Sequence, residues 1–185
     1  AIFSLINSLL LRPLPVERPD QLVAVSIGDA SIEESDLGYA TFDQIRRHPE
    51  GFSAALAFSH CCSQATVTAG RERWPVDRFF ASGDFFSTLG LSPAAGRFFT
   101  PADDVVGGGA AGVSAVISYR LWRERFGGRP DVVGAPIVVD RAPATVIGVA
   151  PRTFLGLDVG RSFDVILPAK AQPVVAPSIA FEDTT

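Results

Sequence analysis

Two runs rich in β-branched residues lie between residues 135 and 151 and constrain the fold more than any other feature. In APIVVDRAPATVIGVAP these runs flank a short break at Asp140–Ala142. Successive side chains of a strand point to opposite faces, so alternation of this kind is typical of half-buried strands. The sequence therefore predicts an antiparallel hairpin over 135–151 that turns at Asp140–Ala142.

Similar short segments alternate with helical patterns and with breaks rich in glycine and proline. Strands are expected at 21–27 and 52–60, on both arms of a hairpin over 64–82 that turns near Ala69–Gly70, at 114–118 and at 164–168. Helices are expected at 41–48, 82–90 and 119–126. The sum is an α+β fold in which most strands are antiparallel. A long surface loop (91–112) and a tail with little pattern (169–185) complete the chain.

Polar residues mark the start of each expected helix. Thr41 and Gln44 have the spacing of a capping box. Either Ser82 or Asp84 can cap the second helix, and Ser118 can cap the third. These signals support the three helices independently of their apolar positions.

The chain begins with AIFSLINSLLLRPLP, in which residues 1–11 are almost wholly apolar. A signal peptide is disfavoured, because no basic segment precedes the run and no small-residue cleavage site follows it. The run suits either a core helix or the outer end of a transmembrane helix, and these residues alone favour neither. It is too short to span a bilayer, which takes ~20 apolar residues.

The composition excludes several classes of protein. The chain has 185 residues, of which 47% are hydrophobic, so it can bury a core in one domain or two small ones. Its net charge of -4 argues against a nucleic-acid surface, which needs a basic face. Lys170 is the only lysine and lies far from any glycine-rich phosphate loop, so we do not expect this segment to hydrolyse ATP.

The histidines and cysteines lack the spacing of a metal site. His48 and His60 are the only histidines, and His60 is followed directly by Cys61 and Cys62. A tetrahedral zinc site needs about four ligands, and consecutive residues of a strand cannot converge on one ion. We therefore expect no metal and no cofactor, with copper or redox chemistry at the cysteine pair as the remaining alternative.

The candidates for catalytic groups are equally weak. Paired carboxylates at Glu33–Glu34 and Asp103–Asp104 lie in expected loops without apolar pocket residues beside them, where such groups are usually solvated or cap helices. The G-x-S-x-G pattern of a nucleophile elbow does not occur. The residues therefore predict a protein without catalytic groups.

Phenylalanine recurs in doublets at 79–80, 85–86 and 98–99. One interpretation is a core of two layers. The other is a partner-binding surface formed by the exposed members of the doublets, because exposed aromatic patches usually mark interfaces.

Four ordered blocks of the sequence resemble one known family. The blocks are ASGDFFSTLGLSPAAGRFFTPADD (81–104), SAVISYRLWRERFGGRPDVVGAPIVVD (114–140), ATVIGVAP (144–151) and DVILP (164–168). In order and spacing they are similar to the MacB-like periplasmic core domain of ABC-transporter permeases of the FtsX-like superfamily. The start of the chain, followed by PDQLVAVS, is similar to the large duplicated permeases of acidobacteria.

The resemblance implies two lobes and a connection to the membrane. Residues 1–15 would be the outer end of the first transmembrane helix and its exit. Residues 16–63 would form a first porter-like βαβ unit, and 64–168 an inserted, mostly antiparallel β lobe with short helices. Residues 169–185 would be a tail or the connection to a second βαβ unit that is not recognisable here, so the porter-like lobe would be incomplete.

One turn departs from the pattern of this family. The hairpin turn of the family is usually Asn-Gly-like, which suits a two-residue turn, whereas this chain has Asp140-Arg141. We therefore expect a longer or different turn that extends through Ala142.

The resemblance also implies a function. The domain would be a non-catalytic, periplasmic part of an inner-membrane permease that passes ATP-driven motion to a periplasmic partner or substrate. Its implied partners are the flanking transmembrane helices, a separate ATPase subunit, an adaptor or lipoprotein carrier and a second copy or pseudo-copy, but no nucleic acid. The residues that we expect to contact a partner are Phe85, Phe86, Phe98, Phe99, Asp103 and Asp104. The alternative is an extracytoplasmic sensor or ligand-binding module without transport.

Overall fold

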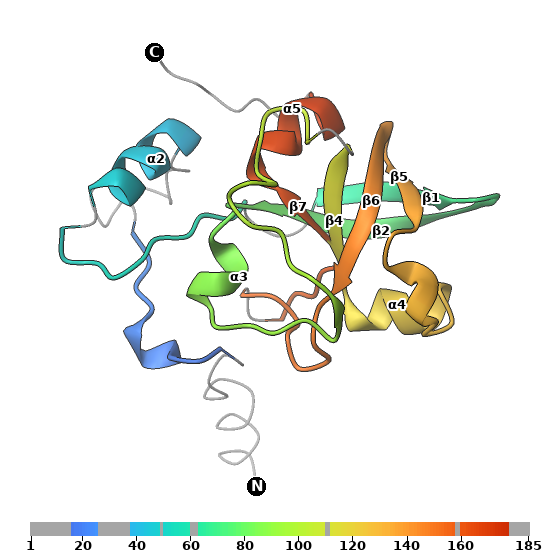
Figure 1. Cartoon of the computed structure of the whole chain (residues 1–185), viewed down its shortest axis with the longest axis horizontal. Coiled ribbons are helices and arrows are strands. Elements are labelled where there is room, and N and C mark those ends of the chain that lie inside the picture. Colours follow the sequence, from blue (N-terminus) through green and yellow to red (C-terminus); the bar gives the residue numbers. More distant parts are fainter. Residues whose placement is uncertain are drawn as a thin grey trace, which may run out of the picture.

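The strands of the computed structural model pair into a closed ring (Figure 1). The structure describes residues 16–25, 38–48, 50–59, 63–109, 112–157 and 160–177. Its strands are β1 (Ser63–Ala69), β2 (Glu72–Ala81), β3 (Ala95–Gly96), β4 (Val113–Ile117), β5 (Pro136–Val139), β6 (Ala142–Val149) and β7 (Val165–Pro168). Their order is β3-β6-β4-β7-β2-β1-β5, and β5 also pairs with β6, so all strands except the short β3 form a barrel. Among these pairings β2–β7 and β4–β6 are parallel and the others antiparallel.

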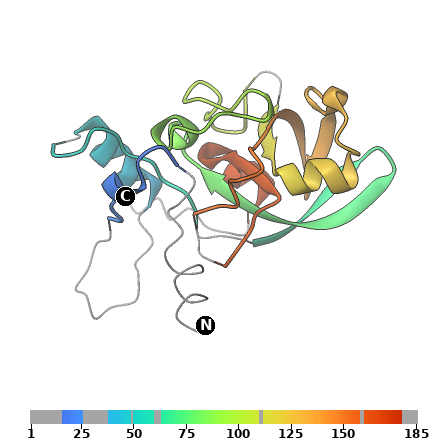
Figure 2. The same cartoon turned by 90° about the horizontal axis from the view of Figure 1, so that it is seen from below.

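Short helices surround this barrel. They are η1 (Pro19–Gln21), α2 (Tyr39–Arg47), α3 (Phe85–Thr88), α4 (Tyr119–Arg125), η2 (Pro130–Val132), η3 (Ala169–Ala171) and α5 (Gln172–Val175). Residues of α4, η2 and α5 pack into the barrel core, with α4 and α5 at opposite ends of the strands (Figure 1). The α2 helix lies apart from the sheet in both views (Figures 1 and 2). The mixed α/β architecture expected from the sequence is confirmed.

The core has two layers because β2, β4 and β7 are buried on both faces. Phe80, Ile117 and Leu167 belong to the cluster inside the barrel. Their neighbours in sequence point the other way and pack with α3 and the loop aromatics; these include Phe79, Val116 and Ile166. Strands that are buried on both faces have continuous apolar runs, which is why the Phe79–Phe80 doublet occurs here.

Both expected hairpins are present. In β1–β2, Val67 lies opposite Trp74, and the turn contains Gly70 at a φ of 60°. In β5–β6, Val139 pairs with Ala142, so the turn holds only Asp140 and Arg141 and the longer turn is wrong. The turn does differ from an Asn-Gly-like one, because Asp140 has a positive φ and Arg141 does not.

Asp140 itself has a φ of 55°, in the region that disfavours side chains. Bonds to Thr66 of β1 hold it there: the Asp140 N–H donates to the Thr66 carbonyl at 2.7 Å, and the Asp140 Oδ1 accepts from the Thr66 N–H at 2.9 Å. These bonds clasp the seam between β1 and β5, which otherwise pair only at Val67–Val139 and Thr68–Val138.

The three helices expected from the sequence are present, but only one of their three predicted N-terminal caps forms. At α4 the Ser118 hydroxyl accepts from the Leu121 N–H at 3.0 Å, as expected. At α3 no side chain caps the helix, although Asp84 occupies the N-cap position. The α2 helix begins at Tyr39, after Gly38, whose carbonyl already accepts from the Thr41 N–H. The expected Thr41 capping box is therefore wrong, because Thr41 lies inside the first turn.

The strands expected on either side of α2 do not form in the described residues. Residues 22–25 have no strand partner, and Val23 and Val25 are exposed. Residues 52–57 are irregular, and only Phe58 makes a bridge, to Ala81. An extended segment becomes a strand only where another segment pairs with it, and alternation in the sequence does not supply that partner. The proposed boundaries of the two lobes stay a prediction.

Two segments are more buried than their composition suggested. The loop 91–112 contains β3, and it buries Phe99 and Asp104. The start of the tail forms η3 and α5, which bury Ala171 and Val175 in the barrel core. Among the described residues no helix has the length and apolar character to cross a bilayer. The apolar run 1–11 lies outside those residues.

Candidate functional site

The residues predicted to contact a partner divide into a buried and a partly exposed set. Phe85, Phe86, Phe99 and Asp104 are at most 3% exposed. Phe98 and Asp103 keep part of their surface in solvent. Partner contact stays a prediction, and in this structure only the second set offers a surface for it.

The buried phenylalanines form a single aromatic cluster outside the barrel. Phe85 makes edge-on contacts with Phe79 and Phe86, with ring centroids 5.7 and 5.2 Å apart. Phe98 stacks on Phe86 of α3 with ring centroids 3.8 Å apart, and Phe86 is buried. Such contacts stabilise a core beyond the area they bury. The second and third doublets thus build the outer layer of the core.

Asp103 links residues of the loop 91–112 to one another on the solvent-exposed side of the loop. Its carboxylate accepts two hydrogen bonds from the Arg97 guanidinium, at 2.7 and 2.8 Å, and one from the Thr100 N–H at 2.9 Å. The Arg97 hydrogen bonds hold the pKa of Asp103 well below its usual range. The group is therefore a charged brace at neutral pH.

Asp104 is the buried carboxylate of the loop, and it accepts hydrogen bonds from three other segments of the chain. It accepts hydrogen bonds from the Tyr39 hydroxyl at 2.8 Å, from the Gly83 N–H at 3.1 Å and from the Lys170 N–H at 2.8 Å. The expectation of a solvated side chain is wrong for Asp104, because its partners come from three distant segments.

Two further buried charged groups had no signal in the sequence. Asp164 accepts from the Asp77 N–H at 3.1 Å and from the Arg120 guanidinium at 2.8 Å, and burial raises its pKa. Arg78 is 4% exposed and donates to Asp140 Oδ2 at 3.3 Å. The partners of Asp164 are 87 and 44 residues away in the chain, so only the fold brings them together.

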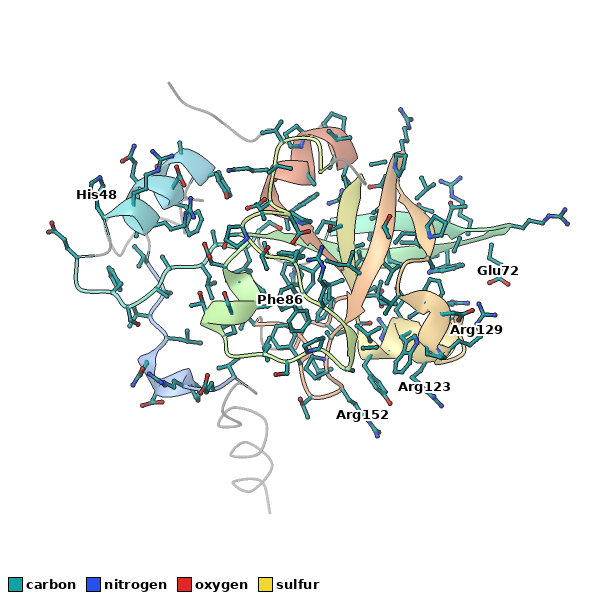
Figure 3. All side chains as sticks on the ribbon, in the orientation of Figure 1. His48, Glu72, Phe86, Arg123, Arg129 and Arg152 are labelled. Atoms are coloured by element: carbon teal, nitrogen blue, oxygen red, sulfur yellow. The ribbon has the colours of Figure 1, made fainter. Side chains whose placement is uncertain are left out.

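The metal-site candidates do not meet in the described part of the chain. His48 is exposed at the outer end of α2 (Figure 3), and His60, Cys61 and Cys62 lie outside the described residues. No group of three or more His, Cys, Asp or Glu side chains that could hold a metal occurs among the residues the structure describes.

The loop 91–112 presents an apolar surface near α5. Val106 is 77% exposed, Val105 37% and Val174 46%. The Val174 side chain lies close to Gly107, where an added Cβ would be 3.7 Å from it, so Val174 lies beside the segment of chain that carries Val105 and Val106. We call these three residues the valine patch. Exposed apolar side chains that gather in this way often mark an interface.

Comparison with known proteins identifies the family. A family model described as MacB-like periplasmic core domain matches residues 1–182. The chain belongs to this family. The resemblance of the four blocks to the MacB-like periplasmic core domain of ABC-transporter permeases is thereby confirmed.

A solved structure shares the fold of this MacB-like domain, and a second is similar to part of the chain. The periplasmic region of MacB from Actinobacillus actinomycetemcomitans is 15% identical with a TM-score of 0.54, over 80% of this chain and 62% of that one. The extracellular domain of the noncanonic ABC-type transporter YknZ from Gram-positive bacteria is 17% identical with a TM-score of 0.49, over 64% and 56%. The chain thus spans less than two thirds of each of these domains. The comparison with curated proteins finds no match.

Proposed function

We propose that this MacB-like domain is a non-catalytic relay that passes ATP-driven motion of a membrane-embedded permease to a periplasmic partner or substrate. The family match over residues 1–182 carries the proposal. ATP would be hydrolysed by a separate subunit, since the only lysine of this chain lies in no glycine-rich phosphate loop.

The packing of the barrel suits such a relay. The strands close into a ring, and β2, β4 and β7 are packed on both faces. Close-packed interiors have low compressibility and pass strain on instead of absorbing it. A push at one end of the barrel is therefore delivered at the other end.

The valine patch and the partly exposed Phe98 and Asp103 are the surface that we propose for the partner. All except Val174 belong to the loop 91–112, which the sequence singled out. An adaptor or a lipoprotein carrier is the partner that a periplasmic relay requires. A second copy or pseudo-copy of the domain would stand beside it in the complete transporter.

Photo-crosslinking in the full permease with its ATPase tests this proposal. Benzoylphenylalanine replaces Val106 in one variant and Glu72, exposed at the outer end of the β1–β2 hairpin (Figure 3), in the control. We expect the Val106 variant alone to form an adduct that mass spectrometry identifies as an adaptor or lipoprotein carrier. The yield should change when vanadate blocks the ATPase.

Two outcomes would contradict the relay. Equal adducts at both positions would show that the contact is not specific to the patch. A specific adduct whose yield ignores vanadate would favour the sensor, because a sensor binds its target without a cycle of ATP hydrolysis.

A further inference from the structure

One carboxylate joins the ends of two parallel strands. In the β2–β7 pair Ala81 lies opposite Pro168, and the chain continues from these residues to Gly83 and Lys170. The Gly83 N–H donates to Asp104 Oδ2 at 3.1 Å, and the Lys170 N–H donates to Asp104 Oδ1 at 2.8 Å. Asp104 is only 3% exposed, so these donors replace water around its charge.

The same carboxylate also holds α2. The hydroxyl of Tyr39, the first residue of α2, donates to Asp104 Oδ2 at 2.8 Å. The Lys170 ammonium lies 5.4 Å from the centre of the Tyr39 ring, which adds a cation–π contact. Burial and the bond to Asp104 raise the pKa of Tyr39, so its hydroxyl keeps the proton that it donates.

A second contact that the structure describes between α2 and the segments beside the barrel is weaker. Arg46 Nη1 lies 3.6 Å from Asp84 Oδ2, and both side chains are about a third exposed, so this ion pair contributes little. Phe42 is buried, yet neither of the two core clusters of the described residues includes a residue of α2. The helix lies apart from the sheet (Figure 1), which is consistent with a polar attachment.

We propose that Asp104 is a releasable pin between α2 and the barrel. With the pin in place the two move together, and without it α2 detaches while the barrel stays folded. The pin deepens the proposed function, because a relay needs a point where motion enters the barrel. Only that role in transport rests on the proposed function, whereas the attachment itself rests on the contacts above.

Hydrogen exchange of the full chain, read by mass spectrometry, tests the attachment. Tyr39→Phe removes a single hydroxyl and leaves the ring. We expect amides over 42–47 to exchange about tenfold faster, since a hydrogen bond to a charged acceptor is lost. Amides over 113–117 should keep their rate. The control is Tyr119→Phe, which changes the only other tyrosine and should leave 42–47 unchanged.

A second variant removes the charge of the pin. In Asp104→Asn the amide nitrogen must face either the Lys170 N–H or the Gly83 N–H and the Tyr39 hydroxyl, so donors oppose each other on one side. We expect a larger increase over 42–47 than in Tyr39→Phe, and faster exchange at Gly83 or Lys170. If this variant does not fold, the Tyr39→Phe result decides alone.

The pin is overturned if Tyr39→Phe leaves exchange over 42–47 unchanged. It is also overturned if 113–117 speeds up equally, because that pattern shows a loss of global stability. Transport by the full permease separates the pin from the relay. A Tyr39→Phe permease that loosens α2 but keeps full transport supports the pin and contradicts the relay, whereas a loss of transport together with loosening supports both.

Discussion

Asp103 and Asp104 are neighbours in the sequence with opposite surroundings. The sequence predicted that both are solvated or cap helices, because no apolar pocket residues stand beside them. That prediction failed for Asp104, whose donors are 65, 21 and 66 positions away. A local pattern reports only the neighbours within a turn or a strand, so a carboxylate that bridges distant segments has no local signature.

At this scale the brace formed by Asp103 predicts a dependence of stability on pH. Its pKa is lowered in the folded chain, so its contribution is present above the unfolded pKa of about 3.9 and is lost as the pH falls through the folded pKa. Asp103→Asn should lower the free energy of unfolding by about 1 kcal/mol at pH 7, because the Arg97 partner is 58% exposed and screened. Urea unfolding at a series of pH values measures this difference.

The difference between the native chain and Asp103→Asn should shrink below about pH 4. Asp164 contributes in the opposite sense, because its raised pKa stabilises the folded chain more as the pH falls. Both proteins contain Asp164, so this contribution cancels in the difference between their free energies of unfolding. Asp131→Asn is the control, since Asp131 and Arg129 form an ion pair with both side chains about 70% exposed. An equal loss in the two variants would show that Asp103 is no more than a surface charge.

At the scale of elements, the sequence predicted correctly those helices and hairpins whose stabilising contacts lie between residues close together in the chain. Both hairpins and α4 with its Ser118 cap are present because each depends on residues within a few positions. The strands expected at 21–27 and 52–60 depend on a partner that the local pattern does not contain. Closure of the barrel through β5 could not be predicted for the same reason, because β1 and β5 are far apart in the sequence.

The close pairing of β3 with β6 depends on a glycine. A Cβ on Gly148 would overlap the Arg97 carbonyl oxygen, which belongs to the backbone and cannot move aside by a side-chain rotation. Gly148→Ala should therefore lower the free energy of unfolding by about 2–3 kcal/mol through overpacking. Gly109→Ala is the matched control, because a Cβ there meets nothing within 4 Å. Urea titrations of both variants measure this loss of stability. Equal unfolding midpoints would contradict the close approach of Gly148 to the Arg97 carbonyl.

At the scale of the whole molecule, different interactions stabilise the barrel and hold α2 to it. Apolar packing on two faces of β2, β4 and β7 stabilises the barrel. The α2 helix has a polar attachment at Asp104. The two lobes implied by the family resemblance stay a prediction, and the contact between α2 and the loop at Asp104 joins residues that are 65 positions apart in the sequence.

This difference predicts an order of amide exchange in the native chain. Local opening needs least free energy where few apolar contacts break, so α2 should exchange first. The central strands β4 and β7 should exchange last, at rates set by global unfolding. Mass spectrometry at a series of labelling times gives the order. Equal protection of α2 and β4 would mean that the whole chain opens as one cooperative unit.

The seam between β1 and β5 has a consequence for behaviour at high concentration. The strands meet through two residue pairs, clasped by the bonds of Asp140 to Thr66. Opening the barrel at this seam breaks only these few bonds and leaves the other strand pairs intact. Once the seam is open, β1 and β5 each present an unpaired edge, and such an edge is a template on which a strand of a second copy pairs. The bonds of Asp140 to Thr66 therefore also protect these two edges from pairing with another copy.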